Sequence, residues 1–561
     1  MTDDDYFDLG SYHRPVRTPC PQAQVWFDRG LVWAYAFNHE EAVACFERAL
    51  ELDPDLAIAR WGVAYAVGPN YNKAWEAFDP VDRKTSLARA RAELTLAERG
   101  RVSEVEHDLI SALWARFRTA DPENPDALVA GGVAYADAMS VLAAAFPNDI
   151  DVQALAADAL VNVTAWALWD TSTGEPAPGS RVLDAKRLLE KALARPAGRT
   201  HPGILHLYLH TMEMSPTPED ALPAADLLRG LVPDAGHLQH MPSHIDVLCG
   251  DYRSSVVANQ DAVQADRRFV AQRGPFNFYS LYRAHDLHFI VYSAMLQGQS
   301  QTALRAADEL AGQLTPELLS IESPPMADWL EAFVPLRTHV LVRFGRWDEL
   351  IAQRLPDDEE LYCSTAATMH YGRGVALAAT GRLERARAER AAFHAAYDRI
   401  PESRYLFNNS ARDILAVGAA MLDGEIAYRE QRFDEAFTHL GRAIQLDDAL
   451  PYDEPWGWMQ PTRHAYGALL LEQGRVEEAA AVYAADLGLD PTLARCCQHP
   501  GNVWSLHGYH ECLQRLGRSD EAAIVGQQLR LAAARADVPV RASCACRLDV
   551  APCCDERGPR D

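Results

Sequence analysis

Residues 26–55 read WFDRGLVWAYAFNHEEAVACFERALELDPD and contain a complete pair of expected helices. In the first helix a small residue stands between two large ones, and the second carries the spacing Ala-x3-Phe-x2-Ala before a closing Pro. Small residues let two antiparallel helices approach closely, and the Pro ends the second helix. Seven positions carry this pattern: Trp26, Gly30, Trp33, Ala42, Phe46, Ala49 and Pro54.

The same pattern recurs imperfectly further along the chain. In each of these units a short turn connects two stretches in which apolar residues recur with the helical period, as expected for two helices joined by a short connection. Three units lie near the C-terminal end, at Gly424, Phe433, Ala436 and Ala443, at Gly467, Leu470, Ala479, Tyr483 and Pro491, and at Trp504, Gly508 and Ala522. Weaker units turn at Gly250, Gly298, Gly345 and Gly381.

This pattern resembles the tetratricopeptide repeat, a helix pair of about 34 residues. The resemblance is strong near both ends of the chain and degenerate between them. It implies an all-α fold, a right-handed superhelix (α-solenoid) of antiparallel helix pairs in which each pair covers the apolar face of its neighbour. Strand signals are nearly absent, with helices expected at 151–170 and 181–194 and a loop at 170–180.

A chain of 561 residues could hold several globular domains, but the resemblance implies one elongated array of repeats. The expected organisation is an N-terminal extension at 1–20, a continuous helical array at 21–538 and a Cys-rich tail at 539–561. Within the array, clear repeats are expected at 23–68 and 421–535, degenerate ones at 70–200 and His-rich ones at 201–300.

Composition and charge exclude several classes of protein. The net charge of 53 − 79 = −26 argues against a nucleic-acid partner and against an anionic membrane surface. No run approaches the roughly 18 apolar residues that span a bilayer, and the acidic start MTDDDYFDLG is unlike a secretory signal. The 11 Cys match no secreted disulfide framework. We therefore expect a cytoplasmic protein with reduced thiols and no membrane partner.

Histidines gather in three short runs, which hold seven of the 19 in the chain. Their spacings of i, i+3, i+4 and i+7 put each run on a single helical face. The runs are His206, His210 and Glu213, then His237, His240 and His244, and finally His285 and His288.

The histidine runs are also in register with the repeat. His206 to His240 and His210 to His244 are each 34 residues apart, which is one repeat period. In tetratricopeptide-repeat proteins the corresponding first-helix positions commonly line the concave groove. The resemblance therefore implies one cluster of about seven imidazoles and a carboxylate there. The HxxxHxxE, HxxHxxxH and HxxH groups also resemble a His-rich bacterial subgroup of the family, from which no defined activity can be carried over.

Imidazoles with a carboxylate form the ligand set of Zn, Fe, Cu or Mn, and helical spacing places two ligands on one ion. The predicted ligands are His206, His210, Glu213, His240, His244, His285 and His288. Candidates for a catalytic role are Tyr208, Tyr282, Tyr292 and His237. So many ligands leave open two ions, or one ion beside a catalytic His. Fe or Cu is favoured, because many neutral imidazoles suit redox metals. The alternative is that these residues are polar groove residues that bind an acidic peptide, or that they only form hydrogen bonds to other side chains.

A second candidate metal or thiol site lies in the Cys-rich tail. Cys544, Cys546, Cys553 and Cys554 could hold Cu(I) or Zn as thiolates. The alternative is a flexible tail of incidental thiols.

Two classes of function remain. The chain lacks a phosphate loop, a Gly-x-Gly-x2-Gly motif, a Gly-x-Ser-x-Gly elbow and His-Glu-x-x-His. The first class is a metal-dependent oxidase or oxygenase that acts on a small molecule or peptide in the groove, with a metal-dependent hydrolase as its variant. The second is a non-catalytic scaffold for a protein partner, and the charge favours a basic one. Histidines concentrated in three repeats favour a localised site. The sequence identifies neither metal, nuclearity, substrate nor oligomeric state.

Overall fold

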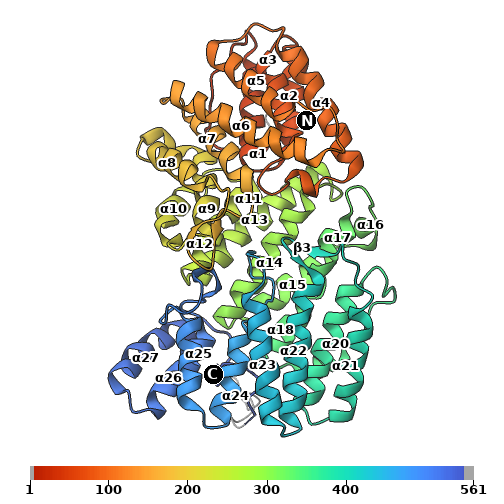
Figure 1. The fold of residues 1–561 in the computed structure, drawn as a ribbon, viewed down its shortest axis with the longest axis vertical. Coiled ribbons are helices and arrows are strands. Elements are labelled where there is room, and N and C mark those ends of the chain that lie inside the picture. Colours follow the sequence, from red (N-terminus) through yellow and green to blue (C-terminus); the bar gives the residue numbers. More distant parts are fainter. Residues whose placement is uncertain (1–5, 549–561) are drawn as a thin grey trace, which may run out of the picture. The chain divides into compact units, whose positions relative to one another are not determined.

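The computed structural model describes residues 6–548 and is built from α-helices throughout (Figure 1). Within those residues the strands form two antiparallel hairpins of two-residue strands, β1 with β2 and β3 with β4. Consecutive helices pack as antiparallel neighbours, most extensively α1 with α2, α20 with α21 and α22 with α23. The expectation of an all-α array of helix pairs is confirmed.

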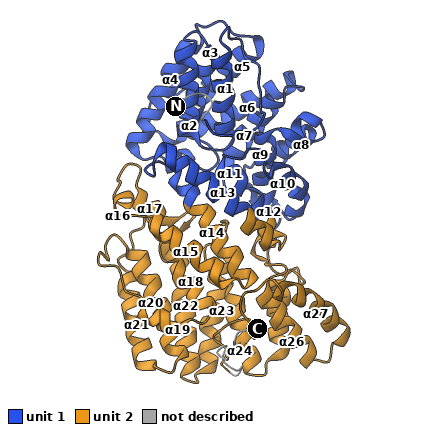
Figure 2. Ribbon diagram, turned by 180° about the vertical axis from the view of Figure 1, so that it is seen from behind, with its two compact units in different colours: residues 1–245, 258–283 blue, residues 246–257, 284–561 orange. Residues whose placement is uncertain are grey.

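The chain divides into two compact units, which are coloured separately in Figure 2. Unit 1 holds residues 1–245 and 258–283, and unit 2 holds residues 246–257 and 284–561. The helices α12 (Pro242–Leu248), α13 (Tyr252–Arg273) and α14 (Ser280–Gln297) contribute residues to both units. Each unit is described by itself below.

The remaining elements of unit 1 are mostly short helix pairs. They are α1 (Pro21–Tyr35), α2 (His39–Leu52), α3 (Ala57–Ala66), η2 (Trp75–Ala77), α4 (Pro80–Ala97), α5 (Glu104–Arg116), α6 (Pro125–Ala145), α7 (Ile150–Val161), η3 (Asn162–Thr164), β1 (Trp169–Asp170), β2 (Glu175–Pro176), α8 (Val182–Leu193), η4 (Pro196–Thr200), α9 (Pro202–Glu213), η5 (Pro218–Ala221), α10 (Leu222–Leu228) and α11 (Gly236–His240).

Unit 2 continues with longer and more regular pairs. Its elements are α15 (Ser300–Gln313), α16 (Pro316–Leu319), α17 (Met326–Leu330), η6 (Glu331–Phe333), α18 (Leu336–Arg343), α19 (Trp347–Ala352), α20 (Cys363–Ala379), α21 (Leu383–Tyr397), β3 (Tyr405–Leu406), β4 (Asn409–Ser410), α22 (Ala411–Arg429), α23 (Phe433–Asp448), α24 (Thr462–Glu472), α25 (Val476–Asp486), η7 (Arg495–Cys497), α26 (Val503–Arg515) and α27 (Ser519–Ala533).

The small and large residues of the first repeat interlock as the sequence pattern predicts. The Phe46 ring is fully buried between α1 and α3. A Cβ atom added to Gly30 would lie 2.5 Å from this ring, and one added to Gly62 would lie 2.7 Å from it. The last repeats show the same packing of an aromatic ring against two glycines, because the Tyr483 ring faces Gly467 and Gly508. Glycine at these positions therefore allows the helices to approach over an aromatic side chain.

The turns within the helix pairs share one backbone geometry. Gly298, Gly345 and Gly381 each adopt a positive φ just after a helix, as the sequence pattern predicts. The amide of the next residue then donates to a carbonyl five residues back, as Arg382 N does to Leu377 O at 2.8 Å. This Schellman geometry satisfies carbonyls at the helix end and favours glycine. Phe37 occupies the same place after α1, at a φ of +56°.

Two helix expectations were wrong in detail. The helix expected at 151–170 ends at Val161, where a 3-10 turn follows and Trp166 takes a φ of +58°. The single helix expected across the second histidine run is split into α11 and α12 before Pro242. A proline has no amide hydrogen to donate and its ring clashes with the preceding turn, so the helix is interrupted there.

The sequence analysis found no apolar run long enough to span a bilayer, and one helix of the structure is nevertheless a candidate by length and composition. α6 has 21 residues, and its most apolar window has a mean hydropathy of 1.6 with 39% of that window buried. Asp126 and Asp137 interrupt the apolar run, so a count of uninterrupted apolar residues misses this helix. Its length and composition would allow a crossing, although core helices of water-soluble proteins pass the same test. In unit 1, α6 packs against α5 and α7.

Candidate metal centre

Unit 1 brings five predicted histidines and Glu213 together in its interior. His206, His210 and Glu213 lie on α9, His237 and His240 on α11, and His244 on α12. Neighbouring rings in the group have centroids 4.7–6.2 Å apart. One ligand atom from each of His206, His210 and His237 lies within 4.8 Å of the other two. The helical spacing therefore does place these side chains at one spot.

The two histidines of α9 have their Nδ1 atoms committed as hydrogen-bond donors. His206 Nδ1 lies 2.5 Å from the carbonyl oxygen of Tyr35, and a carbonyl can only accept. His210 Nδ1 lies 3.0 Å from the carboxylate of Glu213, which also accepts. The Nε2 atom of each ring is then the unprotonated one. Both Nε2 atoms are buried and have no hydrogen-bond partner among the described residues. Such fixed tautomers are typical of metal-binding histidines.

The second histidine run is fixed in the same way. His240 Nδ1 lies 2.6 Å from the side-chain oxygen of Asn259, and His244 Nδ1 lies 2.8 Å from Glu213. Their Nε2 atoms face each other at 2.7 Å. With both Nδ1 atoms donating, an unprotonated Nε2 on each ring would direct a lone pair at the other. A proton shared by the two nitrogen atoms, or a cation bound to both from one side, would relieve the repulsion of those lone pairs.

Glu213 contacts two histidines of the cluster. Its two carboxylate oxygens accept from the Nδ1 atoms of His210 and His244, at 3.0 and 2.8 Å. The carboxylate is fully buried, so these bonds compensate its loss of water. A carboxylate in this position orients two imidazoles and raises their basicity. One ligand atom from each of Glu213, His210 and His244 lies within 4.8 Å of the other two, so Glu213 as a metal ligand stays a prediction beside this orienting role.

Burial keeps these imidazoles neutral. His206, His210 and His240 are fully buried. Desolvation lowers the pKa of His206 to about 3 and that of His240 to about 4, and it lowers the pKa of His210 well below its usual range. A neutral imidazole keeps the lone pair that a metal needs, whereas a protonated one cannot bind. The cluster is therefore ready for metal binding at neutral pH.

Aromatic side chains cover the cluster, and the sequence pattern did not identify most of them. The ring centroid of Phe37 lies 4.4 Å from His206 and 5.6 Å from His210, that of Tyr71 4.7 Å from His210, and that of Tyr282 4.7 Å from His237. A positive φ costs a residue such as Phe37 about 1–2 kcal/mol. The sequence contained one indication of this aromatic cover: Phe37 occupies the turn position at which other helix pairs carry glycine.

A cavity of about 290 Å³ in unit 1 reaches this aromatic cover. Phe37 and Tyr282 line it and also touch the histidine cluster. Polar groups line the other side, among them Asn70 and Lys73, whose ammonium lies 2.5 Å from Asp82. Its size lies near the lower end of the range for small-molecule sites. Of the three predicted tyrosines, Tyr282 both lines this cavity and packs against a histidine of the cluster.

The other two predicted tyrosines have different neighbours. Tyr208 lies on α9 but directs its hydroxyl to Glu190 on α8 at 3.4 Å. Tyr292 lies in unit 2 with its ring centroid 6.3 Å from His499. His285 and His288 also belong to unit 2. His285 packs against Phe289 and Phe407, and His288 Nε2 lies 2.8 Å from the sulfur of Met459.

Another buried histidine of unit 2 gives a pH-dependent prediction. Burial lowers the pKa of His339 to about 4, below its ordinary value of 6.5. Below pH 6.5 the unfolded chain therefore takes up a proton that the folded chain refuses, and stability falls on acidification. We expect His339→Gln to lessen the loss of unfolding free energy between pH 7 and pH 5 by about 2 kcal/mol.

Urea denaturation of both proteins at pH 7 and pH 5 measures this difference. His107, whose side chain is 69% exposed, provides the matched control, because His107→Gln should leave the acid dependence unchanged. Equal acid dependence of the His339→Gln and wild-type proteins contradicts the prediction.

The Cys-rich tail is described in part. Cys544 and Cys546 are joined as a disulfide, with Cα atoms 5.2 Å apart, whereas the sequence led us to expect reduced thiols. One intervening residue is enough to bring the two sulfur atoms together here. Cys553 and Cys554, the other half of the predicted thiolate site, lie outside the described residues.

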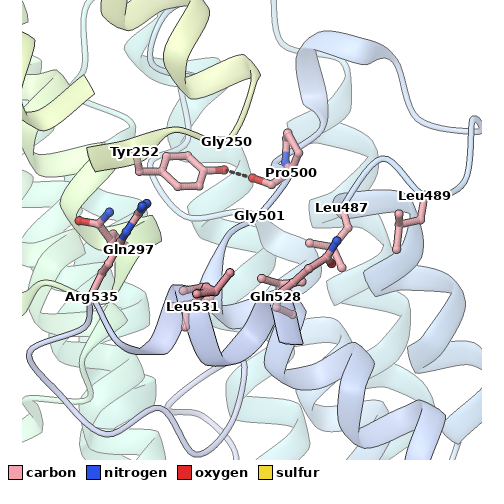
Figure 3. Close-up of a pocket in the computed structure, with 13 residues that line it drawn as sticks. Gly250, Tyr252, Gln297, Leu487, Leu489, Pro500, Gly501, Gln528, Leu531 and Arg535 are labelled. Carbon is pink, nitrogen blue, oxygen red and sulfur yellow. Dashed lines mark hydrogen bonds between the residues drawn. The ribbon is translucent and has the colours of Figure 1, made fainter. Parts of the chain in front are cut away.

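The largest cavity among those described is in unit 2 and has a volume of about 410 Å³ (Figure 3). Leucines such as Leu487 and Leu531 line it, with Gln297 and Arg535 at its edge. The hydroxyl of Tyr252 donates to the carbonyl of Pro500 at 3.0 Å and is thereby occupied. The lining contains no histidine, cysteine or carboxylate. The chemistry needed for metal binding therefore lies in unit 1 and not here.

Comparison with known proteins supports the repeat. Residues 23–56 match the family model described as tetratricopeptide repeat. The chain carries a tetratricopeptide repeat. This tetratricopeptide repeat covers α1 and α2, the stretch with the clearest sequence pattern. No curated protein sequence matches the chain. The resemblance to a His-rich bacterial subgroup stays a prediction.

Solved structures of similar fold are distant in sequence. A human IFIT1 dimer with m7Gppp-AAAA is 12% identical, with 85% of this chain and 90% of that chain covered and a TM-score of 0.34. Ypp1 is 8% identical, with 94% and 89% covered and a TM-score of 0.41. Yeast Tom70 is 12% identical, with 90% of each chain covered and a TM-score of 0.26.

Proposed function

We propose that the protein is a metalloprotein whose tetratricopeptide-repeat scaffold holds a transition metal in unit 1. The ligands are the Nε2 atoms of His206 and His210 together with a ring nitrogen of His237. One observation carries this proposal: ligand atoms of the three side chains lie within 4.8 Å of one another in a fully enclosed site. The fixed tautomers and depressed pKa values of His206 and His210 support it.

The donor set favours Fe or Cu, with Zn or Mn as alternatives. Several neutral imidazoles without a thiolate suit these metals, and Glu213 serves them through hydrogen bonds. His240 and His244 are candidates for a second ion, because their Nε2 atoms face each other at 2.7 Å. The proposed centre therefore holds one or two ions.

We further propose an oxidase or oxygenase acting on a small molecule or peptide. A redox metal would pass electrons from the substrate, which is oxidised, to dioxygen, which is reduced, whereas a zinc ion would favour hydrolysis. The cavity beside Phe37 and Tyr282 would hold the substrate, with Lys73 and Asn70 to orient its polar groups. Burial raises the pKa of Tyr282, so its phenol stays protonated at neutral pH and can serve as a hydrogen-bond donor next to His237.

A non-catalytic scaffold is the second candidate function. The tetratricopeptide repeat at residues 23–56 and the net charge of −26 favour it, since such a surface would attract a basic protein partner. In that case the histidine cluster is a structural core.

X-ray absorption of the metal-loaded chain separates these candidates. Metal-free protein is loaded in turn with Fe(II), Cu(I) and Zn(II) under anaerobic conditions. We expect at least three nitrogen ligands at about 2.0–2.1 Å with the imidazole scattering pattern. Oxygen uptake by the Fe or Cu form, and none by the Zn form, supports an oxidase. Failure of the folded protein to take up any of the three metals supports the scaffold.

Glu213→Gln tests the orienting role of the carboxylate. Glutamine has the same shape but one acceptor oxygen, so only one of His210 and His244 keeps its Nδ1 bond. We expect the metal affinity to fall by about 10–100-fold, with all imidazole ligands still present. Competition with a coloured chelator measures the affinity. Glu190→Gln on α8 is the control, and equal affinities of the two variants contradict the assignment.

A further inference from the structure

The chain does not leave unit 2 after its last helix. Asp537 turns back to α15, where its carboxylate accepts from the amides of Ser300 at 2.7 Å and Gln301 at 2.9 Å. These amides belong to the first turn of α15 and have no partner within that helix. Residues 539–548, here called the C-terminal segment, therefore start from an anchored point.

The middle of the C-terminal segment is held through both its backbone and its serine side chain. The guanidinium of Arg343 donates to the carbonyl of Ser543 at 2.8 Å. The hydroxyl of Ser543 donates to the carbonyl of His464 at 2.9 Å and lies 2.5 Å from the hydroxyl of Tyr483. Ser543 is only 2% exposed. A larger or charged side chain has no room at this position.

The end of the C-terminal segment is held by charge. Arg429 donates to the carbonyl of Cys546, and the amide of Leu548 donates to Glu472 at 3.2 Å. Arg547 donates to Glu511 at 2.7 Å, and the Arg547 side chain is only 3% exposed. An ion pair that is shielded on one side contributes more to binding than an exposed surface pair.

Apart from Tyr483 of α25, the residues that hold the middle and the end of the segment lie on the first helices of successive pairs. Arg343 lies on α18, Arg429 on α22, His464 and Glu472 on α24, and Glu511 on α26. A small cavity of about 40 Å³ is lined by Cys544 and Cys546 together with Tyr371 of α20 and Glu425 of α22. First helices also pack against each other, as α18 does on α20 and α20 on α22. Together α18, α20, α22, α24 and α26 form the groove in which the segment lies.

We propose that this groove of unit 2 is a site for an extended peptide and that the C-terminal segment is its intramolecular ligand. The partner is a peptide segment with a serine followed four residues later by an arginine and small residues between them. Groups of the groove bond to main-chain carbonyls of the segment, while the Ser543 and Arg547 sites provide selectivity. A partner with this pattern binds only when it displaces the C-terminal segment.

Covalent attachment gives the C-terminal segment an advantage over a free peptide. A short flexible connection corresponds to an effective concentration of the order of millimolar. A free peptide of the same sequence is therefore excluded from the wild-type protein at micromolar concentration. Weakening the attached segment alone removes this competition and leaves the groove intact.

The test uses the full chain and a fluorescent synthetic peptide of residues 539–548 with its two cysteines joined. Arg547→Glu places a carboxylate against Glu511 and expels the attached segment. By fluorescence anisotropy we expect this variant to bind the peptide at least about 10-fold more tightly than the wild type does. Arg535→Glu makes the same charge change at an exposed residue shortly before the segment and should behave as the wild type. Equal binding by all three proteins, or none by a folded Arg547→Glu protein, overturns the proposal.

A second measurement leaves the groove and the segment unchanged. A protease site inserted after Val538 allows the segment to be cut from the folded full chain. We expect the cut segment to co-elute with the protein and to be released by excess synthetic peptide. A segment that separates immediately on cleavage, or that excess peptide cannot release, overturns the proposal.

Discussion

A protein in which His206 and His210 are both replaced by alanine is expected to bind a transition metal at least about 100-fold more weakly than the wild type. These two side chains supply Nε2 atoms that are buried, neutral and without a hydrogen-bond partner among the described residues. Their loss removes two of the three proposed ligands of one ion. Loss of a residue that only orients a ligand already costs 10–100-fold, so removal of two ligands costs more. Chelator competition at equilibrium measures the change.

The control for this double variant removes two histidines outside the cluster. His107 and His439, with side chains 69% and 35% exposed, are suitable. The His107→Ala, His439→Ala protein should keep the wild-type affinity. Metal binding that falls equally in both double variants would show that exposed histidines bind the metal, and it would contradict the site in unit 1.

Phe46→Ala is expected to lower the free energy of unfolding by about 3–5 kcal/mol. The ring is completely buried and fills the space that Gly30 and Gly62 leave between the helices. The two glycines have no side chain that could move into the cavity, so the site cannot collapse easily. This places the expected effect toward the upper end of the range for a buried aromatic residue.

Urea denaturation followed by circular dichroism measures this loss. Phe276 is 58% exposed in the same unit, and its replacement by alanine should change the free energy of unfolding by less than about 0.5 kcal/mol. If Phe46→Ala is no more destabilising than Phe276→Ala, the packing inferred for the first repeat is wrong.

The helix-pair fold could be predicted because its determinants are local. Gly298, Gly345 and Gly381 mark turns through their own backbone freedom, and Phe46 with Gly30 marks a close helix contact within one repeat. The structure differs from the predicted helices where a single residue interrupts a helix although the apolar periodicity continues. Pro242 splits a helix and Trp166 leaves the helical conformation, and neither effect is visible in the apolar pattern.

The candidate site was predictable in composition but not in detail. Helical spacing together with the repeat period identifies the face that carries His206, His210 and His244. The tautomers depend on Asn259 and on the carbonyl of Tyr35, which is 171 residues from His206 in the chain. Such partners are brought in by packing and leave no mark on the spacing. For the same reason the sequence predicts Glu213 as a ligand but does not reveal that its two oxygens accept from two rings.

The metal content of the full chain, purified without a metal-binding tag, tests the central claim most directly. Elemental analysis of the folded protein should find one or two transition-metal ions per chain, with Fe or Cu favoured. The His206→Ala, His210→Ala protein, prepared in parallel, should have lost at least one of them. A folded wild-type protein that carries no transition metal, and takes up none when Fe, Cu, Zn or Mn is added, would contradict the proposed centre.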